Sequence, residues 1–128
     1  MKKPRWVQRD VVLALHERLV AEFGGSSGMR DETLFDSALA RPLNRFSHKK
    51  PSIFDLAAAY AFGLARNHAF LDGNKRIGFA TAVLFLELNG YRFIATEADA
   101  TIQTLALAAG EIDEPNYAEW IKENSRKK

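Results

Sequence analysis

The sequence predicts an all-α protein that folds as one domain, and three observations support this prediction. The 128 residues are enough to bury a substantial core and show no internal repeat or domain boundary, so we expect a single domain over residues 1–128. Six segments between residues 8 and 122 have the apolar spacing or the capping residues of helices. One of them, 77–88, contains only Thr81 and Glu87 as polar residues, which is typical of a buried helix. We therefore expect about six helices around a buried central helix.

The composition excludes several classes of protein. Apolar residues make up 47% of the chain and charged residues 27%, which is ordinary for a soluble globular domain. The net charge of +2 does not indicate a nucleic-acid-binding protein, because such proteins gather basic residues on one face. The chain has no Cys for a disulfide framework, no apolar signal peptide and no segment that would cross a bilayer. We expect a cytoplasmic protein that binds neither membranes nor nucleic acid directly.

The first helix is expected from about Gln8 to Phe23, where apolar residues recur at helical spacing, after a loose basic segment over residues 1–6. Gly24 and Gly25 end this helix and begin a loop. His16 lies on the helix, and we interpret its ring as exposed to solvent or satisfied by a local partner.

The second helix is expected from Asp31 to about Ala40 and is closed by Arg41-Pro42. Residues 43–50 then form an exposed basic connector with one aromatic residue. The third helix is expected from Ser52 to about Asn67, because Ser52 and Asp55 fit a capping box. Its body consists mostly of small apolar residues, which allow close packing against neighbouring helices.

Three elements are expected after the central helix, which Asn89-Gly90 ends. Residues 91–94 form a short extended piece. Thr96 is a good N-cap for a helix that runs to Gly110, and a last short helix covers Pro115 to Lys122. The tail, 124–128, is polar and basic and is expected to fray.

The connection between the third and the central helix holds the densest group of polar residues. It reads Arg66, Asn67, His68, Ala69, Phe70, Leu71, Asp72, Gly73, Asn74, Lys75 and Arg76. The free N–H groups at the start of a helix favour an anion, phosphate above all, and Lys75 and Arg76 add two cations there. Asp72 is a hard oxygen ligand suited to Mg²⁺, and His68 is able to act as a general base near neutral pH. Together these groups suggest transfer chemistry on a nucleotide.

Each of these residues also has a purely structural explanation. Asp72-Gly73 is an ordinary turn and helix cap, and Lys75 and Arg76 are explained as a solvated first turn, although cations there oppose the helix dipole. A P-loop is excluded because the residue five positions before Gly73 is His68 and not Gly. A zinc site is not expected, since the chain has no Cys and no His-x-x-x-His pair.

The stretch from His68 to Arg76 resembles the active-site motif of the Fic/Doc superfamily, which reads His-Pro-Phe-x-Asp/Glu-Gly-Asn-Gly-Arg. Lys75 stands where Fic enzymes have the second Gly, which is the mark of the death-on-curing (Doc) branch, and Ala69 replaces the Pro. The length also matches Doc toxins, so the resemblance covers nearly the whole chain. It implies a Fic/Doc-type helical bundle in which Phe70 anchors the motif loop in the core.

The resemblance implies a toxin of a type II toxin–antitoxin system that transfers the γ-phosphate of ATP or another nucleoside triphosphate to a Ser or Thr hydroxyl. In this mechanism His68 accepts the proton of the attacking hydroxyl and Asp72 holds Mg²⁺. The phosphates are bound by Gly73, Asn74, Lys75, Arg76 and Arg66. The usual target in the family is the translation factor EF-Tu, on which the sequence itself is silent.

Two other functions stay open at this stage. The first is AMP transfer, as in most Fic proteins, against which Lys75 argues because its side chain crowds a pocket that Gly leaves open. The second is a non-catalytic binding module that keeps the scaffold.

The resemblance also implies two interactions with other proteins. No Glu in the chain has Ser or Thr four residues before it, so the self-inhibiting Ser/Thr-x-x-x-Glu element is missing. An antitoxin whose disordered C-terminal segment folds onto the domain is then expected. Residues 43–50 lie where the family has a flap that docks the target by strand pairing, although a plain solvated loop explains them equally well.

Overall fold

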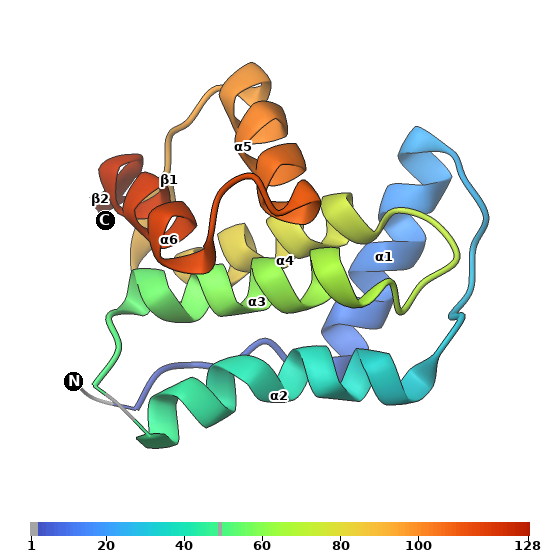
Figure 1. The fold of residues 1–128 in the computed structure, drawn as a ribbon, viewed down its shortest axis with the longest axis horizontal. Coiled ribbons are helices and arrows are strands. Elements are labelled where there is room, and N and C mark those ends of the chain that lie inside the picture. The colour runs from blue at the N-terminus through green and yellow to red at the C-terminus, as the bar shows by residue number, and fades with distance from the viewer. Residues whose placement is uncertain (1–2, 49) are drawn as a thin grey trace.

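The structure is a computed structural model that describes residues 3–48 and 50–128. Six helices and two short strands follow one another along these residues: α1 (Arg9–Phe23), α2 (Glu32–His48), α3 (Ile53–Asn67), α4 (Asn74–Leu88), β1 (Tyr91–Phe93), α5 (Glu97–Ala109), α6 (Glu114–Glu123) and β2 (Ser125–Lys127). The strands form a single two-stranded sheet, so the predicted all-α class is confirmed (Figure 1). Across the described part of the chain, every helix falls short of the length and apolar character needed to cross a membrane.

Helix α3 lies at the centre of the bundle, and α2, α4, α5 and α6 all pack against it (Figure 1). Ten of its fifteen residues are buried. Small residues bring its neighbours close: a Cβ added to Gly63 would lie 3.1 Å from the backbone of Ala38 in α2. A Cβ added to Gly78 of α4 would lie 2.9 Å from the carbonyl oxygen of Ala61. This close packing fixes α3 and α4 side by side, so the loop that joins them has a rigid support at both ends.

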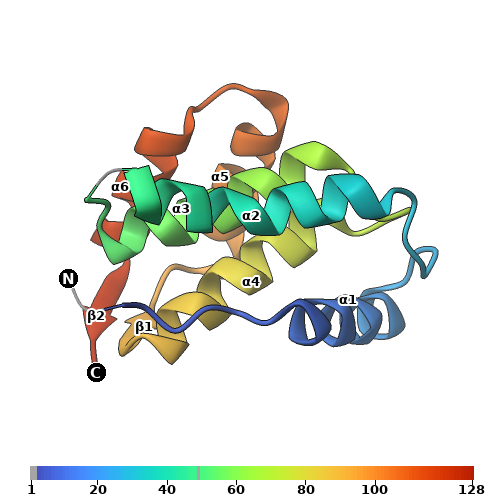
Figure 2. The same cartoon turned by 90° about the horizontal axis from the view of Figure 1, so that it is seen from below.

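Helix α4 is the segment that the sequence predicts as the buried central helix. Seven of its fifteen residues are buried, and α1, α3, α5 and β1 pack around it. Figure 2 shows it between α1 on one side and the layer of α2 and α3 on the other. The central position is therefore shared by two helices, of which α3 is the more deeply buried.

The second helix does not end at Arg41-Pro42, and this prediction is wrong. Helix α2 continues through the buried Pro42 to His48, so residues 43–48 of the expected connector are helical, while Lys49 lies outside the described residues. Proline removes one backbone hydrogen bond and favours a helix end. Contacts beyond it preserve the helix: the Phe46 ring packs edge-on against Trp6 at 5.6 Å, and Arg45 pairs with Glu114 of α6.

Both ends of the chain are more ordered than the sequence predicts. The tail forms β2, which pairs antiparallel with β1 in the register Tyr91 to Lys127 and Phe93 to Ser125, so the expectation that it frays is wrong. In the N-terminal segment, Arg5 exchanges backbone hydrogen bonds of 2.8 and 2.9 Å with the Asn89 side chain. Met1 and Lys2 lie outside the described residues.

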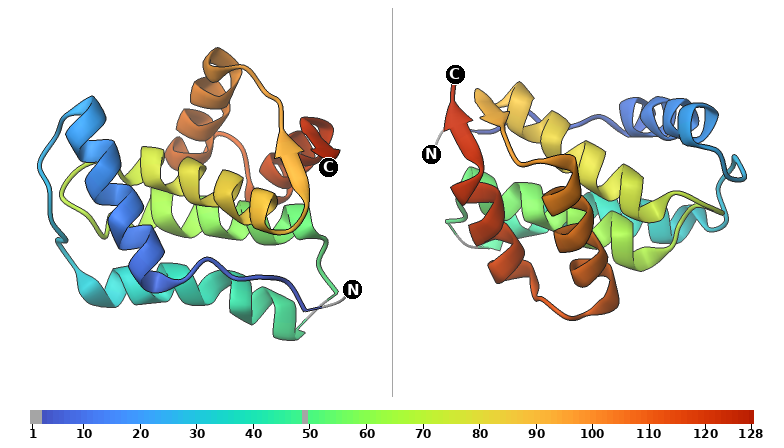
Figure 3. Two further views of the ribbon diagram at one scale, coloured as in Figure 1. Left: turned by 180° about the vertical axis from the view of Figure 1, so that it is seen from behind. Right: turned by 90° about the horizontal axis from the view of Figure 1, so that it is seen from above.

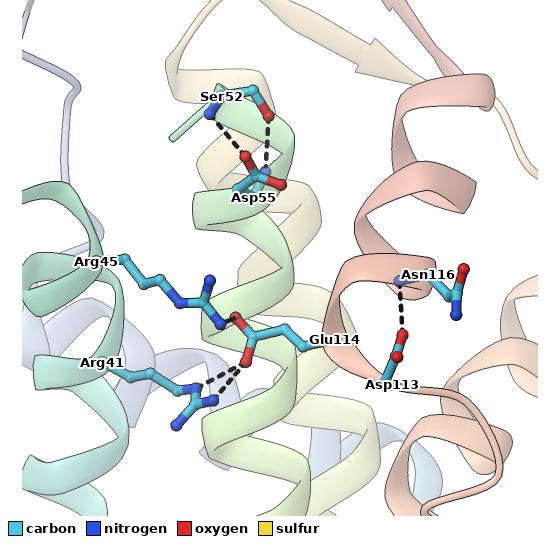
Figure 4. A network of polar contacts seen from close by, with 7 residues as sticks. All are labelled: Arg41, Arg45, Ser52, Asp55, Asp113, Glu114 and Asn116. Atoms are coloured by element: carbon cyan, nitrogen blue, oxygen red, sulfur yellow. Dashed lines mark hydrogen bonds and ion pairs between the residues drawn. The ribbon is translucent and has the colours of Figure 1, made fainter. Parts of the chain in front are cut away.

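A polar network joins α2 to α6 across α3, as Figure 4 shows. The buried Glu114 carboxylate lies 2.6 Å from a guanidinium nitrogen of Arg41 and 2.8 Å from one of Arg45. The Arg41 guanidinium also lies over the Phe62 ring of α3, 4.2 Å from its centroid. The same view contains the predicted capping box, in which Ser52 N–H donates to Asp55 at 2.9 Å and Asp55 N–H donates to Ser52 at 3.1 Å.

Candidate active site

The polar motif forms the connection between the C-terminal end of α3 and the N-terminal end of α4 (Figure 1). His68 caps α3 with a left-handed backbone (φ 52°, ψ 46°), which is uncommon outside glycine and is often found at functional sites. Gly73 caps the start of α4 in the same region (φ 78°, ψ 19°). These two turns reverse the chain within five residues and bring both helix ends to one place.

Asn74 fixes the shape of this loop. Its side-chain oxygen accepts a hydrogen bond from Phe70 N–H, and its amide group donates one to the Phe70 carbonyl, both at 3.0 Å. Asn74 is 9% exposed, so its side chain faces the protein. These contacts engage the side-chain amide, so the phosphate contact expected of Asn74 stays a prediction for its backbone N–H.

Phe70 is buried beneath the loop, in keeping with a role as its anchor. Its ring stacks on His16 of α1, with centroids 3.7 Å apart and planes inclined by 14°. The edge of Phe35 from α2 meets it at 5.3 Å. Helices α1 and α2 therefore hold the side chain on which the loop rests.

The first turn of α4 is open to an anion. No side chain caps this helix, and among the described residues the backbone N–H groups of Asn74, Lys75 and Arg76 have no hydrogen-bond acceptor. Lys75 and Arg76 are exposed, and Arg76 lies over the Phe23 ring at the end of α1, 4.4 Å from its centroid. Free N–H groups, the positive end of the helix dipole and two cations at one point suit a phosphate group.

Asp72 is exposed beside this turn and fits the role of a magnesium ligand. One carboxylate oxygen accepts a hydrogen bond of 2.7 Å from Ser26 N–H, which orients the side chain. No cluster of three acidic, His or Cys side chains occurs in the described ranges. Mg²⁺ commonly takes one or two carboxylates and completes its shell with water and substrate phosphates. A single oriented carboxylate next to a phosphate site matches this chemistry.

His68 and Arg66 differ in their relation to the loop. The His68 carbonyl accepts a hydrogen bond of 2.9 Å from the Arg30 side chain. His68 is exposed at the rim of the site. The Arg66 guanidinium lies 5.2 Å from the Phe62 centroid and next to Gly110 at the end of α5. Among the described residues, its side chain makes no hydrogen bond or ion pair with the motif loop.

A second loop, residues 24–31, lies along the motif loop, and the sequence did not indicate this. Arg30 N–H and Asp31 N–H both donate to the Ala69 carbonyl, at 2.7 and 2.9 Å. Leu71 N–H donates to the Gly28 carbonyl at 3.2 Å. Figure 3 shows the two loops at the same end of the molecule, beside the end of α1.

Residues 43–48, expected as part of a docking flap or a plain solvated loop, are neither. They form the last turns of α2, at the opposite end of α3 from the motif loop (Figures 1 and 2). A helical segment does not pair with a target strand, so both interpretations are wrong for these residues.

His16 contributes to the site from outside the motif, a role that sequence reasoning did not assign to it. It is 1% exposed, and its Nε2 lies 2.7 Å from the Asp72 carbonyl oxygen. Of the two interpretations left open, the satisfied side chain is the one observed. A signal was present, because His16 follows the buried Val12 by four residues and so lies on the same inward face of α1.

Comparison with known proteins gives a consistent result. A protein-family model described as the Fic/DOC family matches residues 6–86. "Protein kinase doc" of Escherichia phage P1 is 29% identical over 119 residues, which cover 92% of this chain and 94% of that protein. "Toxin Doc" of Mycolicibacterium smegmatis is 45% identical over 75 residues, which cover 57% of this chain and 58% of that protein. The region matched by the family model includes the whole motif loop and the loop at 24–31.

Proposed function

Because this chain belongs to the Fic/DOC family, we propose that it is a Doc-type toxin that transfers the γ-phosphate of a nucleoside triphosphate to a protein hydroxyl. The observation that carries this proposal is the uncapped start of α4, where free N–H groups, Lys75 and Arg76 lie beside Asp72 and follow His68 by a few residues. The names of the two relatives, a protein kinase and a toxin, support the same function.

Each group of site residues has a separate role in the phosphate transfer. The γ-phosphate rests against the backbone N–H groups of the first turn of α4, with Lys75 and Arg76 as counter-charges. His68 accepts the proton of a Ser or Thr hydroxyl while the hydroxyl oxygen forms a bond with the γ-phosphorus. The bond from this phosphorus to the β–γ bridging oxygen breaks, and the nucleoside diphosphate leaves.

Magnesium and ATP complete this site in the proposal. Asp72 provides the protein ligand, and Mg²⁺ supplies charge neutralisation of the triphosphate when bound. The hydrogen bond from Ser26 N–H leaves the second carboxylate oxygen of Asp72 available. The Arg66 guanidinium lies over the Phe62 ring. We therefore give Arg66 a long-range role, in which its charge adds to the positive potential around the site.

Lys75 favours phosphate transfer over AMP transfer. Its Cβ and cationic stem stand where a Gly would allow the backbone to approach the α- and β-phosphates. A triphosphate bound in the opposite direction presents its γ-phosphate to His68 and uses Lys75 as a counter-charge. The orientation of the nucleotide then decides the product without any change in the base or the fold.

The biological setting follows from the same proposal. We place the protein in the cytoplasm, with EF-Tu or a similar translation factor as its target. Its partner is an antitoxin whose C-terminal segment folds on binding, because the chain carries no Ser/Thr-x-x-x-Glu element of its own. Expression of the chain alone in bacteria should stop growth, and co-expression of the partner should restore it.

The direct test is peptide mapping of purified EF-Tu incubated with the chain, ATP and Mg²⁺. We expect a phosphate on one Ser or Thr, and no product with Asp72→Asn. AMP on the target would instead identify an AMP-transferring enzyme. Absence of both, with no stabilisation of the chain by millimolar nucleotide, would indicate a binding module.

A further inference from the structure

His16 is a buried polar side chain to which the proposed reaction gives no task. It lies on α1, 1% exposed, with its ring flat against Phe70. Its Nε2 is 2.7 Å from the carbonyl oxygen of Asp72, fifty-six residues away in sequence. A carbonyl oxygen only accepts hydrogen bonds, so Nε2 carries a proton and donates it. His16 thus links the helix beneath the site to the backbone of the residue that is expected to hold magnesium.

This hydrogen bond sets the direction of one peptide group. The chain has no cis peptide bond in its described part, and in a trans peptide the C=O and N–H groups point in opposite directions. Since the Asp72 carbonyl points toward His16, the N–H of Gly73 points away from it, out of the protein core. Gly73 is left-handed and Asn74 begins the helix. Successive N–H groups in this combination form a concave anion site.

The peptide has an alternative orientation that His16 opposes. Gly73 lacks a Cβ, and glycine adopts positive and negative φ with similar ease, so a flip of the Asp72–Gly73 peptide meets little steric resistance. A flipped peptide would turn the carbonyl oxygen toward the phosphate and the N–H away from it. The ring of His16 lies directly beside Gly73, where an added Cβ would be in ordinary van der Waals contact with Nε2, at 3.6 Å.

We propose that His16 is a positioning residue, which holds the Asp72–Gly73 peptide so that the Gly73 N–H faces the transferred phosphate. This inference rests on the proposed phosphate transfer. Loss of the donor should weaken a preorganised contact to the phosphate and leave docking of the target protein unchanged. His16 itself touches neither substrate.

Two substitutions separate the hydrogen bond from the packing. His16→Gln places an amide nitrogen the same number of bonds from Cβ and keeps the donor. His16→Phe keeps a ring that stacks on Phe70 but has no donor. Removal of one preorganised donor to a developing oxyanion costs about 10²–10³ in kcat, and for an indirect effect through His16 we expect about a tenfold loss of kcat in His16→Phe. The KM for the target protein should stay unchanged, and His16→Gln should retain most of the activity.

A second measurement does not depend on activity. In the ¹⁵N-labelled chain, the Gly73 amide resonance should shift when ATP and Mg²⁺ are added to the wild type and to His16→Gln, and much less in His16→Phe. If His16→Phe unfolds, His16→Met provides another variant without the donor. Equal rates and equal Gly73 shifts in the donor and donor-free variants would overturn the inference. So would a wild-type Gly73 amide that does not respond to the nucleotide. If the wild type binds ATP at Gly73 but transfers no phosphate, the proposed function fails, and what stands is that His16 orients the Asp72–Gly73 peptide toward a bound phosphate.

Discussion

Asn74→Ala removes the side chain that closes the motif loop, and its cost follows from two hydrogen bonds. The substitution leaves the N–H and the carbonyl of the buried Phe70 without partners. An unsatisfied buried group costs about 1–3 kcal/mol, so the two together cost about 2–6 kcal/mol, of which the higher helix propensity of alanine restores about 0.5 kcal/mol. We therefore expect the free energy of unfolding to fall by roughly 2–5 kcal/mol and Tm by about 8–20 °C.

Urea denaturation followed by circular dichroism measures this change, and Asn116→Ala is the matched control. Asn116 lies in the first turn of α6 and is exposed, and its backbone N–H donates to Asp113 (Figure 4). Its substitution should change the free energy of unfolding by less than about 0.5 kcal/mol. If Asn74→Ala is as stable as wild type but loses nucleotide binding, the amide serves the phosphate and the structural role assigned to it here is wrong.

Three further predictions concern the base, the polar network and alkaline pH. His68→Asn, which tolerates the left-handed backbone, should lower kcat by about two to four orders of magnitude with an unchanged melting curve, and a rate within tenfold of wild type would remove His68 from the role of base. Replacing both Arg41 and Arg45 by Leu leaves the buried Glu114 unpaired and should lower the free energy of unfolding by about 3–5 kcal/mol. Glu114→Gln should lower it by only about 1 kcal/mol, because both arginines remain partly solvated. Equal losses in urea denaturation would contradict this order. Burial raises the pKa of Tyr117 to about 12, so the stability that its neutral side chain provides is complete below pH 10 and is lost as pH rises through 12. Tyr117→Phe should therefore lose less stability than wild type over this pH range. Parallel curves of stability against pH would contradict the raised pKa.

The helices were predictable where the signal is local. Ser52 and Thr96 accept the capping hydrogen bonds expected of them, and Asn89-Gly90 follows the end of α4. The end of α2 was not predictable in this way, because the local signal of Pro42 is outweighed by contacts with Trp6 and Glu114. The order of the tail depends on pairing with β1, more than thirty residues earlier in the chain, which no local pattern of polar residues reveals.

The candidate site divides in the same manner. The motif is contiguous, so its polar residues and the start of α4 that we propose as a phosphate site follow from sequence. The side chains that shape it come from elsewhere: His16 from α1, and Ser26 and Arg30 from the loop that follows it. A polar residue on an inward helical face gives no indication of which distant carbonyl it meets. Asn74 is a different case, because its place in the motif suggested a phosphate ligand. The sequence did not indicate that its buried amide would instead bond to the backbone of Phe70.

The central claim is that this site transfers the γ-phosphate, and two labels on ATP test it most directly. Wild type and Lys75→Gly are each incubated with the target protein, Mg²⁺ and ATP labelled at either the γ- or the α-phosphate. We predict that wild type transfers only the γ label and that Lys75→Gly loses this transfer. Weak transfer of the α label by Lys75→Gly is compatible with the account. A change of the exposed Lys75 that affected helix propensity alone would cost about 1 kcal/mol of stability and leave the product the same. Transfer of the α label by the wild type would contradict the account and identify an AMP-transferring enzyme that carries a lysine at this position.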